Sequence, residues 1–281
     1  MKIKKNIVVP FQQNNIRADV YFKEQNKGKL LLFLHGFKGF KDWGAWHLVA
    51  QKFAEAGYIF VKFNFSHNGI GQDNFQEFTR LDLFAQNNYT KELENVNTVL
   101  NWIEEDKFWK NINIKDISII GHSRGGGIAL QSAFEDKRIS KVITWASICD
   151  FNRFGTAENI QNWKAQGYKN FYNSRTKQDM KIGFQFYEDY ENNKARLDIE
   201  SAVRKLNKPQ LIIHGTADEA VGFSHAQRLK NWNPKAELHL MENANHVFGA
   251  KHPYEENDLP NDLEKVVELS INYTNCQHKI V

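Results

Sequence analysis

The chain has 281 residues, of which 41% are hydrophobic and 13% aromatic, so it can bury one large core and is expected to form one domain with an insertion. Its 37 basic and 33 acidic residues give a net charge of +4 and are scattered along the chain, which argues against a nucleic-acid-binding face. The sequence has neither an apolar stretch of signal-peptide length at its start nor the roughly eighteen apolar positions in a row that a membrane span needs, so we expect a cytoplasmic protein without a membrane partner.

Short apolar runs rich in β-branched and aromatic residues predict the strands of one sheet. They lie at 7–10, 18–22, 30–35, 58–65, 117–121, 142–147, 211–214 and 238–241. Several runs are apolar on both faces, as strands covered by helices on each side must be. Helical periodicity follows in between, beginning near Trp46, Leu93 and Leu263. Two opening strands followed by strands and helices in alternation predict an α/β fold with a mostly parallel, doubly wound sheet.

The stretch 150–207 interrupts this alternation. It separates the strands expected at 142–147 and 211–214 and shows no clear strand pattern, although it is rich in aromatic and charged residues. A connection of this length is rarely structureless in a compact domain. We therefore predict a helical cap at 150–207, inserted into a core formed by 1–149 and 208–281.

The pattern Gly121-His122-Ser123-Arg124-Gly125 directly follows a predicted strand and precedes a helical run. A serine on such a tight strand-to-helix turn has its hydroxyl exposed at the carboxyl end of the sheet, and the glycines are needed because side chains there would clash across the turn. The N-terminus of the following helix favours a developing negative charge. The pattern predicts Ser123 as a nucleophile, against the alternative of a glycine-rich turn without chemistry.

A nucleophilic serine needs a base, and the base needs a carboxylate to orient it. In this type of fold the acid and then the base follow the serine along the chain, on loops after late strands. Asp218 lies in a glycine turn just after one late strand, and His246 lies in the short polar loop after the next. Asp150, at the end of another strand, is the alternative acid, and His252 is an alternative base that lies further past its strand.

These segments together resemble the α/β-hydrolase superfamily. Within it, the chain is similar to the lidded serine esterases that include feruloyl and cinnamoyl esterases, and to dienelactone-hydrolase-like and serine-aminopeptidase-like proteins. The resemblance rests on the turn around Ser123 and on the segments 35–37, 215–221 and 245–248. It extends from about residue 29 to the end of the chain, whereas the cap matches only in kind.

The resemblance implies that Asp218 is the acid, that His246 is the base, and that the backbone amides of Phe37 and Arg124 form an oxyanion hole. Phe37 follows a strand and Arg124 opens a helix, so both amides can lie at the same edge of the sheet. The side chain of Arg124 is expected in a surface salt bridge, with contact to an acidic group of the substrate as the alternative. At 64–69, where related esterases tend to show a glycine and acidic turn, this chain reads Asn-Phe-Ser-His-Asn-Gly, so the substrate is not carried over.

The predicted function is hydrolysis of carboxylic esters with small, medium or aromatic acyl groups, through an acyl-enzyme and without a cofactor. No metal is expected, because no His, Cys and carboxylate cluster has zinc-like spacing, and Cys149 and Cys276 stand far apart. The alternatives are a peptidase, amidase or thioesterase with the same triad and, in another class, a non-catalytic ligand-binding relative. A peptidase would need carboxylates such as Glu188 or Asp189 to hold a substrate amine. A small-molecule ester is the expected partner, and a homodimer is left open.

Overall fold

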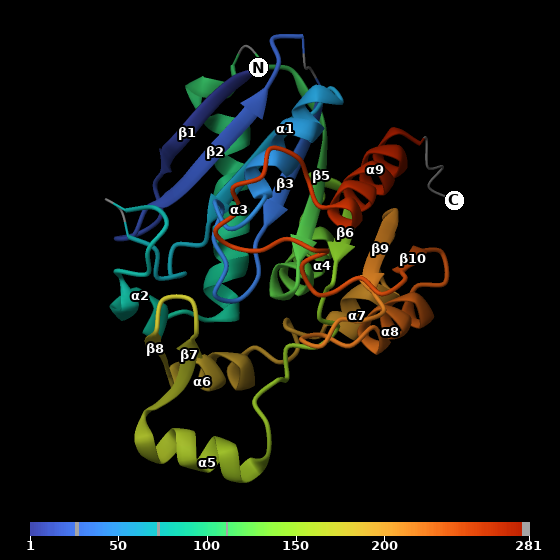
Figure 1. Ribbon diagram of the computed structural model, residues 1–281. Helices are drawn as coiled ribbons and strands as arrows, with labels where there is room; N and C mark the ends of the chain where they lie inside the picture. The colour runs from blue at the N-terminus through green and yellow to red at the C-terminus, as the bar shows by residue number, and fades with distance from the viewer. Residues whose placement is uncertain (26–27, 72–73, 111, 277–281) are drawn as a thin grey trace.

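The computed structural model describes residues 1–25, 28–71, 74–110 and 112–276. Eight strands of this part of the chain form one sheet in the order β1-β2-β4-β3-β5-β6-β9-β10 (Figure 1). β1 and β2 run antiparallel to their neighbours, whereas the other six strands of this sheet, β4, β3, β5, β6, β9 and β10, run parallel to one another. The predicted mostly parallel sheet is confirmed. The strands of the sheet are β1 (Lys2–Val9), β2 (Ile16–Phe22), β3 (Gly28–Leu34), β4 (Ile59–Asn64), β5 (Ile114–His122), β6 (Ile139–Trp145), β9 (Gln210–Gly215) and β10 (Glu237–Met241).

Helices cover both faces of this sheet, as the doubly apolar strands predict. Along β3, Leu30 and Leu32 face the core shared with α3 and α4, whereas Leu31 and Phe33 face the core shared with α1 and α9. The helices are α1 (Trp46–Glu55), α2 (Leu81–Ala85), α3 (Tyr89–Glu105), a 3₁₀ turn (Lys107–Trp109), α4 (Arg124–Glu135), α5 (Ala157–Gln166), α6 (Gln185–Asn192), α7 (Ile199–Arg204), α8 (Ser224–Trp232) and α9 (Asn261–Asn275).

The insertion at 150–207 is not purely helical, so the expectation of a cap without strands was wrong. After α5 the chain forms an antiparallel hairpin of β7 (Tyr168–Asn173) and β8 (Gln178–Gly183) before it enters α6. In β8 the buried Met180 and Ile182 alternate with exposed side chains, which is the period of two typical of a half-buried strand. The strands of the hairpin are only six residues long, and the surrounding aromatic residues obscured this short alternation.

The insertion lies beyond the carboxyl ends of the parallel strands, where ligands of open α/β sheets bind (Figure 1). Its hairpin contacts α2 through β8, α6 contacts α3, and α7 packs against α4 and α8 of the core. The insertion is therefore anchored at several points while α5 projects away from the sheet. In the described part of the chain, no helix is long and apolar enough to cross a membrane.

Candidate active site

Ser123 occupies the turn between β5 and α4, with φ 57° and ψ −121°. A non-glycine residue rarely adopts positive φ, so the surrounding contacts must hold it there. One of these is a 2.9 Å hydrogen bond from the Ser123 amide to the carbonyl of Trp145 on the next strand. A Cβ on Gly121 would overlap the Gly125 backbone, and one on Gly125 would lie 2.5 Å from the carbonyl oxygen of His35. The two glycines are therefore required by close backbone approach, as the sequence pattern indicated.

Ser123, His246 and Asp218 form a continuous hydrogen-bonded chain. Nε2 of His246 lies 3.0 Å from Oγ of Ser123, and Nδ1 of His246 lies 2.8 Å from Oδ2 of Asp218. Ser123 follows β5, Asp218 follows β9 and His246 follows β10. They meet because parallel strands end at the same edge of the sheet. The structure thus brings together the three side chains that the sequence singled out, in a geometry that allows proton transfer from serine to imidazole.

The Asp218 carboxylate is buried and held by several donors. Its Oδ1 accepts hydrogen bonds from the amides of Ala220 (2.9 Å) and Val221 (2.8 Å), and its Oδ2 lies 3.2 Å from Nε2 of His214. Burial by itself would raise the pKa of Asp218, but the hydrogen bonds from His214, His246 and Val221 outweigh it and hold this pKa well below its ordinary value. The carboxylate is therefore ionised and fixed in place, as an orienting acid must be.

The alternative acid and base make other contacts. Oδ1 of Asp150 accepts a 2.8 Å hydrogen bond from the amide of Asn152, two residues further on, and Nδ1 of His252 accepts one of 2.8 Å from the amide of Gly44. Neither side chain hydrogen-bonds to Ser123 within the described residues. The geometry favours Asp218 and His246 over these two.

The backbone near Phe37 passes directly beside the serine. A Cβ on Gly36 would lie 2.9 Å from Cβ of Ser123. The Phe37 amide has no acceptor among the described residues. Arg124 is the first residue of α4, and the amides of a first helical turn lack a partner within the helix. Both amides are therefore free to donate to a group bound at Ser123.

The chain is similar to known proteins both in sequence and in fold. Residues 45–263, more than half of the chain, match the model of the prolyl oligopeptidase family. The chain belongs to this family. Est1E from Butyrivibrio proteoclasticus, solved with ferulic acid bound, superposes with a TM-score of 0.73 at 20% identity over 95% of this chain and 97% of that one.

Two further solved structures share the fold. The esterase domain of a Rhodothermus marinus protein gives a TM-score of 0.65 at 18% identity over 98% of each chain. The dienelactone hydrolase from Anabaena variabilis gives 0.61 at 14% identity over 97% of each chain. The family match identifies this member of the prolyl oligopeptidase family as a serine hydrolase, and the structural similarities show that it has the α/β-hydrolase fold.

The Arg124 side chain does not form the surface salt bridge expected from the sequence. Its Nη2 donates to Oε1 of Glu92 at 2.6 Å, and the two side chains are only 12% and 2% exposed. The guanidinium also lies 4.5 Å from the centroid of the Phe37 ring and close to the rings of Tyr89 and Phe186. Burial raises the pKa of Glu92, and the Arg124 charge opposes that rise. The hydrolase thus buries the ion pair between Arg124 and Glu92, and Arg124 directly follows Ser123 in the sequence.

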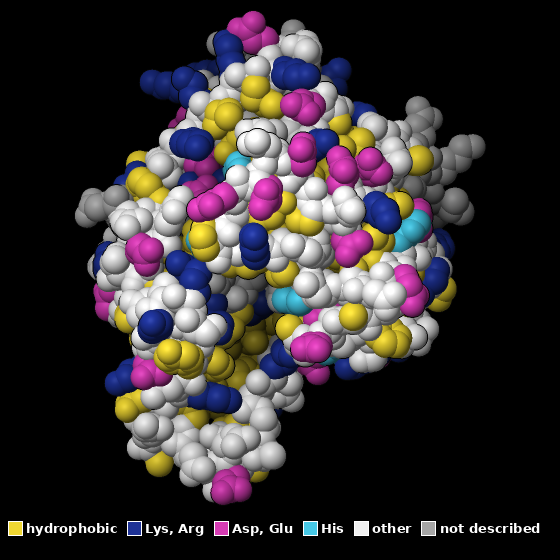
Figure 2. Space-filling view, in the orientation of Figure 1, with side chains coloured by type: hydrophobic (Ala, Val, Ile, Leu, Met, Phe, Trp, Pro, Cys, Tyr) yellow, Lys and Arg dark blue, Asp and Glu magenta, His cyan; other side chains and the backbone are white. Residues whose placement is uncertain are grey.

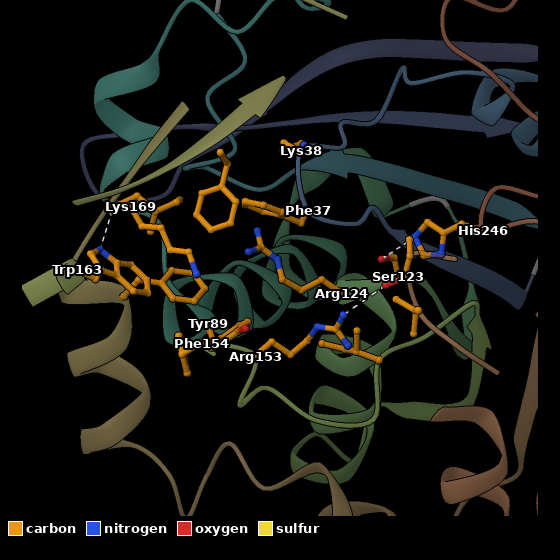
Figure 3. A pocket seen from close by; sticks show the side chains of 16 residues that line it. Phe37, Lys38, Tyr89, Ser123, Arg124, Arg153, Phe154, Trp163, Lys169 and His246 are labelled. Atoms are coloured by element: carbon orange, nitrogen blue, oxygen red, sulfur yellow. Dashed lines mark hydrogen bonds between the residues drawn. The ribbon is translucent and has the colours of Figure 1, made fainter. Parts of the chain in front are cut away.

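A cavity of about 390 Å³ opens beside Ser123, between the core and the insertion (Figure 3). Figure 2 shows the corresponding hollow, with hydrophobic side chains inside it. Its apolar lining is mostly aromatic, and no Asp or Glu lines it among the described residues. The lining residues are Phe37, Lys38, Tyr89, Ser123, Arg124, Ile148, Arg153, Phe154, Trp163, Lys169, Phe171, Ile182, Phe186, Ala220, Val221 and His246.

A second cavity of about 300 Å³ also borders Ser123 and His246, and its lining includes Trp43, Trp46 and Arg175. The loop at 64–69, where this chain departs from the related esterases, lines neither cavity. Of the basic residues that line the first cavity, only Arg124 was singled out from the sequence. No local signal marks Lys38, Arg153 or Lys169, and the last two reach the site only through the folding of the insertion.

Proposed function

We propose that this hydrolase cleaves carboxylic esters through an acyl-enzyme formed on Ser123. His246 takes the hydroxyl proton as Ser123 Oγ attacks the carbonyl carbon, while Asp218 keeps the other imidazole proton on Nδ1. The amides of Phe37 and Arg124 donate to the oxyanion. His246 then protonates the departing alkoxide. A water molecule that His246 deprotonates attacks the acyl group, and the released proton returns to Ser123 as the acid leaves.

The observation that carries this proposal is the hydrogen-bonded chain from Ser123 through His246 to Asp218, with distances of 3.0 and 2.8 Å, at the edge of a cavity. A serine in this arrangement is activated by an adjacent base that is itself oriented by a carboxylate. The complete set of hydrogen bonds from Ser123 to Asp218 also argues against a non-catalytic ligand-binding protein, because such a protein would not need these three residues in this arrangement.

The contribution of the insertion to the cavity wall supports a role for it as a lid that selects the acyl group. It supplies Trp163 from α5, Phe171 from β7 and Ile182 from β8 to the wall of the cavity. Aromatic walls stack against planar rings and enclose short acyl chains. The preferred acyl groups are therefore medium-sized or aromatic rather than long lipid chains.

The charge of the cavity favours esters over substrates with a free amine. Asp189 accepts a hydrogen bond from the Thr90 amide at 3.2 Å, Glu188 is exposed, and neither lines the cavity. A substrate ammonium would therefore meet basic side chains rather than a carboxylate. The family match favours a peptidase as the second candidate, acting on amides without a free amine next to the cleaved bond.

The test compares Ser123→Ala with Ser224→Ala, which removes an exposed hydroxyl at the start of α8. Wild type and Ser224→Ala should hydrolyse 4-nitrophenyl butyrate and react with a fluorophosphonate probe. Ser123→Ala should lose labelling and at least about 10³-fold in kcat. Labelling that persists in Ser123→Ala would exclude this serine as the nucleophile, and faster cleavage of N-acylated aminoacyl anilides than of esters would favour the peptidase.

A further inference from the structure

We propose that the acid portion of the substrate carries a second, ionised carboxylate, which Lys169 binds at the end of the cavity away from Ser123. This inference rests on the proposed ester hydrolysis and names its substrate class. The observations behind it are the unbalanced charge of the cavity, the place of Lys169 in it, and the apolar walls in between.

Among the described residues, four basic side chains line the cavity, and only one of them has its charge neutralised by a carboxylate. Arg124 is paired with Glu92. For Lys38, Arg153 and Lys169, no carboxylate of the described residues lies within 4 Å. Because none of the acidic side chains that the structure describes lines the cavity either, its interior carries an excess of positive charge. A cavity lined by one sign of charge with apolar walls attracts the opposite sign strongly.

Lys169 is the basic residue placed to contact the far end of an acyl group. Figure 3 shows Lys169 with Trp163 at the end of the cavity opposite Ser123 and His246. Its Nζ lies 5.8 Å from the Trp163 ring centroid and 5.6 Å from that of Phe171, and the residue is partly buried. An ammonium group that has lost part of its water to aromatic rings gains more from a ligand carboxylate than a fully exposed lysine does.

Arg153 adds positive charge from the side of the cavity. Its Nη1 lies 3.2 Å from Nε2 of His225, and its Nη2 donates to the Ala220 carbonyl at 3.4 Å. These contacts hold the guanidinium in place without supplying a negative charge. Arg153 is exposed, so we expect it to attract the substrate and to contribute less to binding than Lys169 does.

The apolar lining of the cavity determines what can join the two ends of the acid. Phe37, Phe154 and Phe186 belong to this lining, and their side chains carry no hydrogen-bonding groups. An aromatic or otherwise planar spacer fits this lining, with the ester carbonyl at Ser123 and the carboxylate at Lys169. The substrate class is therefore a half-ester of a dicarboxylic acid with an apolar spacer.

The experiment uses three 4-nitrophenyl esters of 3-phenylpropanoic acid that differ only in the para substituent: carboxylate, carboxamide and aminomethyl. The carboxylate should raise kcat/KM about 10-fold or more over the isosteric carboxamide at low salt, and the cationic aminomethyl ester should be poorest. Lys169→Gln should lower the carboxylate-to-carboxamide ratio of kcat/KM about 10-fold. Arg153→Gln should lower the ratio less.

Lys164→Gln is the matched control, because Lys164 is an exposed lysine of α5 that does not line the cavity. It should leave the ratio unchanged. A wild-type ratio near one, or an equal fall in Lys164→Gln and Lys169→Gln, overturns the inference while ester hydrolysis stands.

If no ester is cleaved, the proposed function fails but the inference is still tested by binding. The methyl ester of the carboxylate compound should then bind the Ser123→Ala protein more tightly than its carboxamide analogue in calorimetry, and Lys169→Gln should abolish the difference. Equal binding of the two compounds overturns the inference.

Discussion

Glu92, buried on α3, accepts a 2.6 Å hydrogen bond from the guanidinium of Arg124, the residue directly after Ser123. Removing one partner of a buried pair leaves the other charge uncompensated. Glu92→Ala should therefore lower the free energy of unfolding by about 3–5 kcal/mol, measured by urea denaturation. The double variant Glu92→Leu, Arg124→Leu should lose less than Glu92→Ala.

Glu200→Ala is the control for this prediction, because it breaks the exposed Arg204–Glu200 pair on α7. Exposed pairs contribute about 0–1 kcal/mol, so its effect should be small. Equal losses of unfolding free energy in Glu92→Ala and Glu200→Ala would show that burial of the Arg124–Glu92 pair has no effect on stability.

Asp218→Asn should reduce kcat for ester hydrolysis by about 10⁴-fold with the fold intact, because an amide cannot hold the His246 tautomer that accepts the serine proton. Asp150→Asn should leave kcat within a few-fold, since its carboxylate accepts the Asn152 amide and makes no hydrogen bond to His246 among the described residues. The measurement is kcat on a nitrophenyl ester, with circular dichroism to check folding. A larger loss in Asp150→Asn would move the acid to that position.

The depressed pKa of Asp218 also predicts a pH dependence of stability. A carboxyl whose pKa is lower in the folded state stabilises the protein above its unfolded pKa of about 3.9, and this contribution is lost as the pH falls below that value. The free energy of unfolding should therefore fall between pH 6 and pH 3 by about 1 kcal/mol more in the wild type than in Asp218→Asn. Identical pH profiles would contradict the assignment.

Gly125→Ala should abolish activity and strongly destabilise the protein, because the new Cβ would lie 2.5 Å from the backbone oxygens of Leu34 and His35. Backbone atoms at this distance cannot move aside cheaply. Gly222→Ala is the control, since the nearest atom to its Cβ would be the Ser224 hydroxyl at 3.8 Å. The thermal midpoint and ester hydrolysis of both variants provide the measurement, and a stable, active Gly125→Ala protein would contradict the prediction.

The lid hypothesis predicts an acyl preference. Catalytic efficiency should be highest on butyryl, octanoyl or hydroxycinnamoyl esters and fall on palmitoyl esters, because the aromatic cavity between core and insertion is of limited volume. Replacing 150–195 by a glycine-serine loop, which keeps α7, should flatten this preference. A folded variant with unchanged acyl preference would argue against a selective lid.

The sequence alone determined the sheet and the turn around Ser123. Apolar runs such as those of β3 and β4 are buried on both faces, and that pattern is local. The spacing of Gly121 and Gly125 around the serine is equally local, since side chains at these two positions would clash with backbone atoms at one strand-to-helix turn. Both features could therefore be predicted without knowledge of the rest of the molecule.

Only the tertiary structure decided which side chains meet. Asp218 rather than Asp150 contacts His246, Arg124 turns inward to Glu92, and Lys169 reaches the cavity from a strand that sequence analysis missed. Each outcome depends on which strand ends lie side by side and on how the insertion folds back over the sheet. Such contacts join residues tens to more than a hundred positions apart, so no periodicity or spacing in the chain records them.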